Sequence, residues 1–140
     1  MIRNIGAALA GIATAFASIY LIEMLGHTIY PPPANLDFSD PDAIRTYIAT
    51  LPIVALLFPM FAWFAATFAG SIVASIIGDA KPWIYPTIVG GLIFSATVAN
   101  LIAIPHPMWF SIISLIGIVA SASLSTRVAV TGNSSQNPLE

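Results

Sequence analysis

Four long apolar segments constrain this chain more than any other feature of its sequence. Prolines, glycines or charged residues separate them, and they cover residues 5–29, 52–77, 83–104 and 108–128. A helix needs about 20 apolar residues to cross the hydrocarbon core of a bilayer, and each segment reaches that length. The segments predict an all-α integral membrane protein, a bundle of four transmembrane helices in one domain, residues 1–128. A mobile polar tail, residues 129–140, is expected to follow.

The composition indicates that lipid is the main solvent of this chain. Hydrophobic residues make up 58% of its 140 residues and charged residues only 7%, and the mean hydropathy is +0.92. Average proteins carry about 25% charged residues, so this chain has too few to cover a surface in water. The net charge of −2 and the lack of a basic patch give no sign of a nucleic-acid partner. The lipid bilayer is the expected partner; a homo-oligomer or a larger membrane complex stays open.

The first segment has a second interpretation. Arg3, the apolar run after it and the triplet Ala15-Phe16-Ala17 together resemble a signal peptide with its cleavage site. The apolar run continues through Leu25, which is longer than a signal peptide needs. A retained transmembrane helix is therefore favoured.

Lysine and arginine positions predict the orientation of the chain. These residues are retained in short loops on the cytoplasmic side of a membrane. With four spans, Arg3, Lys81 and Arg127 share one side, and Arg45 lies on the other. Both termini are therefore expected in the cytoplasm, with the loop of residues 30–51 outside.

The outer loop contains a predicted short helix. Asp40 suits the N-cap position and Pro41 the first turn. Apolar residues then recur at helical spacing, at Ile44, Tyr47, Ile48 and Leu51. We expect a short helix that lies in the outer membrane interface, with an irregular loop as the alternative.

Small residues, each four apart, run along the second segment: Ala62, Ala66, Gly70, Ala74 and Gly78. Small residues let helix backbones approach closely, which drives helix association in lipid. We predict that this stripe packs against another helix, while Phe64 and its neighbours on the opposite side face lipid or fill a groove. The other segments show similar spacings, at Ala7, Gly11 and Ala15, at Thr87, Gly91, Ser95 and Ala99, and at Gly117, Ser121 and Ser125.

Aromatic residues gather near the predicted membrane boundaries. Trp83 and Tyr85 lie near one boundary, and Tyr30, Tyr47 and Trp109 near the other. Such belts are typical of membrane interfaces, and the sequence assigns them no further role.

One small polar cluster stands out in the apolar sequence. Glu23 and His27 are four residues apart near the outer end of the first segment, so they are neighbours on one helix face. A carboxylate facing lipid would be costly. That face, which also carries Ile5, Leu9, Ile12 and Phe16, is therefore predicted to pack into the bundle. His106 lies in the turn between the third and fourth segments on the same side, with Asn100 below it.

The cluster of Glu23, His27 and His106 allows several interpretations. In a structural one, Glu23 and His27 satisfy each other and His106 is a polar turn residue. One carboxylate and two imidazoles are also suitable ligands for a divalent metal ion, and the two histidines could ligate a haem. A carboxylate and an imidazole inside the membrane could instead relay protons or bind a cation. No compact motif selects among these, and no cofactor is expected from the sequence.

No sequence feature indicates catalysis. The chain has no serine-nucleophile motif, no phosphate-binding glycine loop and no cysteine. Apart from serines, threonines and Asn100, polar residues deep in the segments are nearly absent, so a single chain offers no polar path. The expected function is that of a non-enzymatic accessory or interaction subunit in a membrane. The alternative is a small transporter or channel subunit for a cation or proton.

Two stretches, "EMLGHTIYPPP" at residues 23–33 and "IPHPMWF" at residues 104–110, carry a resemblance. They resemble a family of small bacterial inner-membrane proteins of about this length, without an assigned function. The likeness covers the four-helix region and implies a bacterial inner (cytoplasmic) membrane. It brings no catalytic or binding residues.

Overall fold

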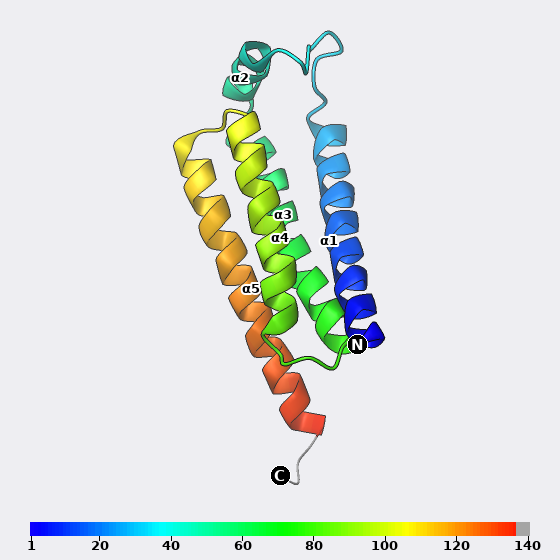
Figure 1. Cartoon of the computed structure of the whole chain (residues 1–140). Helices are drawn as coiled ribbons and strands as arrows, with labels where there is room; N and C mark the ends of the chain where they lie inside the picture. Colours follow the sequence, from blue (N-terminus) through cyan, green and yellow to red (C-terminus); the bar gives the residue numbers. More distant parts are fainter. Residues whose placement is uncertain (137–140) are drawn as a thin grey trace.

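The chain folds into helices joined by short connections. A computed structural model describes the backbone of residues 1–136 and the side chains of residues 1–131. In that range the regular elements are α1 (Ile2–Ile29), α2 (Pro41–Thr50), α3 (Ile53–Ile77), α4 (Ile84–Ala103) and α5 (Met108–Gln136). The four long helices run side by side, and the short α2 sits at one end of the bundle (Figure 1). We call that end the α2 end.

Four helices are long and apolar enough to cross a membrane: Ile2–Ile29, Ile53–Ile77, Ile84–Ala103 and Met108–Thr131. This confirms the prediction of an all-α chain with four long apolar helices. Their ends agree with the predicted segments to within three residues, except at the end of α5. There the helix continues through Gln136, so the first part of the predicted polar tail is helical. The rest of that tail lies outside the described residues.

The short helix α2 begins as the sequence predicts. The side chain of Asp40 accepts a hydrogen bond from the backbone N–H of Asp42 at 2.9 Å, and Pro41 occupies the first turn. The apolar face of α2 points toward the bundle, because Ile48 is buried and Tyr47 packs against the core. α2 therefore acts as a cover over one end of the long helices.

The central helix is α3, which packs against α1, α4 and α5, whereas α1 and α4 contact each other sparsely. Its small-residue stripe is buried at Ala62, Ala66, Gly70 and Ala74, and Gly78 ends the helix. Gly70 meets Gly11 of α1 closely. A Cβ atom added to either glycine would lie 2.5 Å from the carbonyl oxygen of the other. The two backbones can touch here only because both residues lack side chains.

This close contact turns the bulky face of α1 outward. Ile5, Leu9 and Phe16 are 55%, 61% and 51% exposed. The prediction that their face packs into the bundle was therefore wrong for these three residues, whereas Ile12 of the same face packs against the core. The small residues of α1 must point at α3 for the backbones to meet, and the bulky residues then lie on the other side of the helix.

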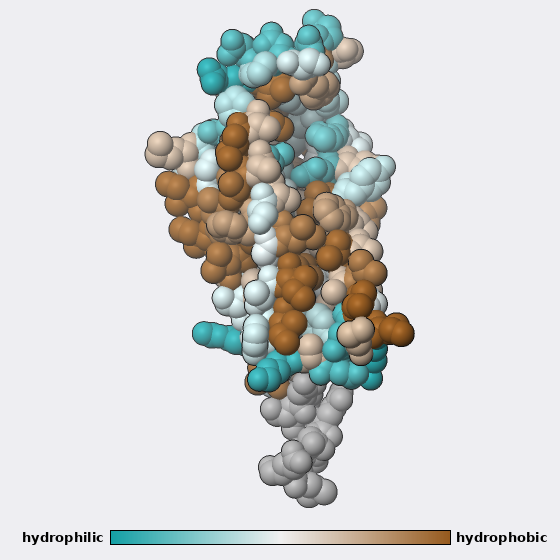
Figure 2. Space-filling model, viewed as in Figure 1, coloured by the Kyte–Doolittle hydropathy of each residue, from teal (hydrophilic) through white to brown (hydrophobic). Residues whose placement is uncertain are grey.

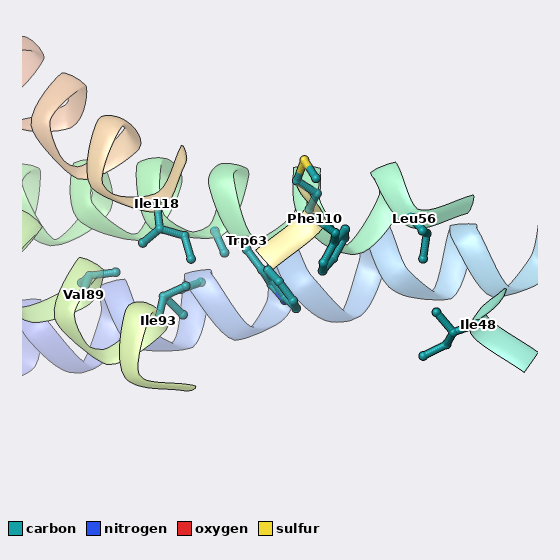
Figure 3. Packing of buried hydrophobic residues seen from close by; sticks show 10 residues of the cluster. Ile48, Leu56, Trp63, Val89, Ile93, Phe110 and Ile118 are labelled. Atoms are coloured by element: carbon teal, nitrogen blue, oxygen red, sulfur yellow. The ribbon is translucent and has the colours of Figure 1, made fainter. Parts of the chain in front are cut away.

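Large side chains of α3, α4 and α5 form the hydrophobic core. Trp63 and Phe110 pack edge to face, with ring centroids 5.6 Å apart. Val89, Ile93 and Ile118 extend the cluster (Figure 3). Trp63 thus lies at the centre of the bundle, close to the α2 end.

Polar contacts fasten the opposite end of the bundle. The Oδ1 atom of Asn4 accepts hydrogen bonds from the Tyr85 hydroxyl and from the backbone N–H of Asp79, each at 3.0 Å. Arg3 pairs with Asp79 at 2.7 Å. Tyr85 is only 2% exposed, so it does not join the interfacial belt that the sequence predicted. It ties the start of α1 to the α3–α4 connection instead.

Candidate binding cavity at the α2 end

A cavity of about 320 Å³ lies beneath α2. The ends of α1 and α4, the start of α3 and α2 itself surround it, and most of its wall is apolar. Glu23, His27, Asn100 and His106 all line this cavity. The fold therefore brings the three residues of the predicted cluster, and Asn100, around one space.

A second, smaller cavity lies deeper in the bundle. It measures about 180 Å³ and lies among α1, α3 and α4. Glu23, Trp63 and Asn100 line both cavities and so mark the boundary between them. Figure 2 shows hydrophilic side chains that interrupt the hydrophobic surface between the α2-end portions of α1 and α4.

Glu23 is held below the end of its helix. It precedes the last residue of α1 by six positions, or about 9 Å at 1.5 Å per residue. The side chain is half-buried, and Trp63 donates a hydrogen bond to it. A carboxylate has about four acceptor positions, so most of them are left for another partner.

His27 does not neutralise Glu23 through a close ion pair. The ion pairs among residues 1–131 are Arg3–Asp79 and Arg45–Asp42. His27 attracts the carboxylate electrostatically from one helical turn away, but its ring is exposed. In the structural interpretation of the sequence, the two residues satisfy each other. Within the described part of the chain they leave each other's hydrogen-bonding groups unused.

His106 is fixed by its neighbours in the α4–α5 connection. Its Nδ1 atom lies 2.8 Å from the carbonyl oxygen of Ile104. A carbonyl can only accept, so Nδ1 carries the proton and Nε2 is left as an acceptor in the neutral ring. The ring stacks on Phe110, with centroids 4.7 Å apart. Burial lowers the pKa of His106 below its ordinary 6.5, against a smaller opposing effect of the Ile104 hydrogen bond.

Glu23, His27 and His106 share a cavity without forming a cluster of ligands. In the part of the chain that the structure describes, no group of three or more histidine, aspartate or glutamate side chains could hold a metal ion. The predicted metal site therefore has its residues near one space, but not in contact around a common point.

Two features of the cavity wall were missed by sequence reasoning. Trp63 lies within a candidate span, whereas tryptophans usually gather at membrane boundaries. This unusual position in the sequence could have indicated that Trp63 has a role inside the bundle. Pro59 lines the cavity together with Ala55. Because proline has no N–H, the Ala55 carbonyl lacks its helical donor and adds another acceptor in this region.

Hydroxyl groups deeper in the bundle are mostly bonded within their own helix. Thr67 donates to the carbonyl of Trp63 at 2.8 Å, and Ser71 donates to the carbonyl of Thr67 at 2.5 Å. Ser114 is buried, and its hydroxyl has no partner among the described side chains. These groups do not extend the polar lining of the cavity across the bundle.

Comparison with protein-family models, with curated proteins and with solved structures finds no match to this chain.

Proposed function

We propose that this protein is a non-enzymatic integral membrane protein, an accessory subunit that holds a small amphipathic molecule in the cavity beneath α2. One observation carries the proposal: Glu23, Asn100 and His106 bring polar groups with unused hydrogen-bonding capacity to a mostly apolar cavity. Binding cavities typically measure about 300–1,000 Å³ and combine apolar walls with a few polar groups. The cavity of about 320 Å³ falls within that range.

The physical reason for a ligand is the cost of unpaired polar groups in lipid. No water in the hydrocarbon region satisfies such groups, and each costs several kcal/mol. A bound molecule with a polar head and an apolar body would satisfy them and fill the space between α1, α3 and α4. Water alone would satisfy the polar groups but would also wet the apolar wall.

The proposal includes a membrane and an orientation. Four apolar helices of sufficient length support a multi-pass membrane protein. The start of α1 and the end of α5 lie at the same end of the bundle, opposite α2 (Figure 1). With Arg3, Lys81 and Arg127 at that end, the positive charges favour a cytoplasmic location for both termini. The proposed location is the bacterial inner membrane, with the cavity toward the outer face.

Filling the cavity tests the proposal. Ala55 lines the cavity, so Ala55→Phe should displace a bound molecule. Ala120→Phe adds the same volume at an exposed position of α5 and serves as the matched control. After purification in lipid nanodiscs, solvent extraction and mass spectrometry should find a molecule enriched with the wild type and with Ala120→Phe, and lost with Ala55→Phe. Equal extracts from all three proteins and from empty nanodiscs would contradict the proposal.

Metal or haem binding by Glu23, His27 and His106 is tested in the same preparation. A ligand at about a hundred times its dissociation constant stabilises the folded state by about 2.7 kcal/mol. A metal site therefore predicts a higher melting temperature on addition of Zn²⁺, lost in His27→Ala and His106→Ala. Haem binding predicts a visible absorption band. Cavity binding of an organic molecule predicts neither.

A further inference from the structure

We infer that the molecule held in this cavity is an amphipathic organic cation, an ammonium group on a small apolar body. The inference rests on the proposed function and names the class of its ligand. Three properties of the cavity wall carry it: its hydrogen-bond acceptors, its lack of permanent positive charge and its aromatic rings.

Several hydrogen-bond acceptors line the polar part of the cavity, beside the donor groups of Asn100 and two tyrosines. Glu23 offers a carboxylate of which Trp63 occupies one position, and His106 offers Nε2 because its other nitrogen is bonded to Ile104. The Ala55 carbonyl, deprived of its helical donor by Pro59, is a third acceptor. A ligand that donates hydrogen bonds or carries positive charge satisfies these groups, whereas a ligand rich in acceptors does not.

The charge of the wall favours a cationic ligand over an anionic one. The residues that line the cavity include no lysine and no arginine, the side chains that usually bind phosphate and carboxylate groups. The Arg45 guanidinium of α2 is engaged with Asp42 outside the cavity. An anionic ligand would therefore meet the Glu23 carboxylate without a permanent counter-charge.

Aromatic rings form part of the cavity wall that Glu23 also lines. Tyr30, Phe38, Tyr47, Phe58 and Trp63 all line the cavity. The face of an aromatic ring attracts a cation that lies within about 6 Å of its centre, which is how proteins recognise quaternary ammonium groups. Rings and carboxylate together suit an ammonium group, and the remaining apolar wall suits its hydrocarbon body.

A fluorescence experiment tests the charge of the ligand. The chain has three tryptophans, and Trp83→Phe with Trp109→Phe leaves Trp63 as the only reporter, at the cavity wall. The protein is placed in nanodiscs of phosphatidylglycerol, a lipid whose headgroup carries no ammonium group. Hexyltrimethylammonium is titrated against its neutral analogue, in which a tert-butyl group replaces the trimethylammonium group, and against hexyl sulfate.

The ammonium probe should change Trp63 fluorescence saturably, with at least tenfold higher affinity than either other probe. Glu23→Gln should lower the affinity for the ammonium probe at least tenfold and leave that for the neutral analogue unchanged. If Glu23→Gln does not fold, the comparison of the three probes on the protein with Glu23 intact still tests the inference. Equal affinities for the ammonium and neutral probes would overturn the inference while leaving cavity binding intact.

Two further outcomes show whether the ammonium group belongs to a lipid or to a free amine, and whether the proposed function fails together with the inference. If phosphatidylethanolamine in the nanodisc abolishes binding of the ammonium probe, the natural ligand is a lipid headgroup ammonium; unchanged binding assigns a free amphipathic amine. If no probe changes Trp63 fluorescence, and Ala55→Phe behaves as the unsubstituted protein does in the extraction experiment, both the inference and the proposed function fail.

Discussion

In the proposed membrane setting, individual polar residues have effects that the same residues would not have in water. Glu23 and Asn100 lie in helices that are apolar enough to span a membrane, where each polar group needs a partner. Asn4 and Tyr85 meet this need within the chain, since the Tyr85 hydroxyl donates a hydrogen bond to Asn4 at 3.0 Å. The polar groups around the cavity instead keep unused hydrogen-bonding positions, which a bound molecule can fill.

The lowered pKa of His106 predicts a pH dependence of stability. In the folded state burial disfavours the protonated ring, so between its lowered pKa and 6.5 the unfolded chain holds more protons. The contribution of His106 to the free energy of unfolding is therefore fully present above about pH 6.5 and falls as the pH drops below that value. His106→Gln removes this contribution, so its melting temperature should fall less between about pH 7.5 and pH 5. An equal fall in melting temperature for the two proteins would contradict the prediction.

Removing the acceptor of Asn4 should weaken the end of the bundle opposite α2. In Asn4→Ala the buried Tyr85 hydroxyl loses its acceptor, which costs about 1–3 kcal/mol for an unsatisfied buried group. Asn4→Asp keeps an acceptor and should lose less. In a double-mutant cycle measured by denaturant unfolding in detergent, Asn4→Ala should cost less once Tyr85→Phe is present, because only the hydrogen bond from the Asp79 N–H is then left to lose. Full additivity of the two substitutions would show that the hydrogen bond contributes nothing.

Pairs of helices differ in how they reach contact. α1 meets α3 backbone to backbone at Gly11 and Gly70, whereas α5 meets α3 with a side chain in a groove. The Phe64 ring occupies the place that a Cβ of Gly117 would take. Phe64 was predicted to face lipid or fill a groove, and it fills one.

A matched pair of glycines tests the backbone contact. Gly70→Ala places a methyl group against the Gly11 carbonyl, which forces α1 and α3 apart and should cost about 1–3 kcal/mol. Gly91→Ala serves as the control, because a Cβ atom there meets nothing within 4 Å. Thermal unfolding in detergent should therefore show a lower melting temperature for Gly70→Ala and no loss for Gly91→Ala. Equal melting temperatures for both variants would show that the close contact of Gly70 with Gly11 does not contribute to stability.

At the scale of the whole molecule, the bundle has an even number of long helices. The start of α1 and the end of α5 therefore lie at the same end of the bundle (Figure 1). α2 and the cavity are on the other side. The bundle therefore separates a polar network at Asn4 and Tyr85 from the proposed binding region. In the proposed membrane placement, the cavity therefore lies toward one side of the bilayer.

Cysteine labelling tests the orientation directly, because the chain has no cysteine of its own. Asn35 lies in the loop before α2 and Thr131 near the end of α5, and both are exposed. A membrane-impermeant maleimide should label Asn35→Cys in spheroplasts and Thr131→Cys only after lysis. Labelling of Thr131→Cys in intact spheroplasts would reverse the orientation.

The sequence by itself determined the elements of this protein. Apolar length predicted the four long helices, because a helix that must satisfy its own backbone in lipid needs about 20 apolar residues. Local chemistry predicted α2, since Asp40 and Pro41 act on the residues next to them. The placement of Glu23 and His27 one turn apart on the same helix also followed from helix geometry alone.

Only the tertiary structure decided how the faces of these helices are used. Helical spacing shows which residues share a face, but not whether small or bulky residues turn inward, and the contact of Gly11 with Gly70 settled that for α1. The same packing brought Trp63 to Glu23 and placed His106 at a cavity with Glu23, more than 80 positions away. These contacts join distant parts of the chain, so no local pattern records them.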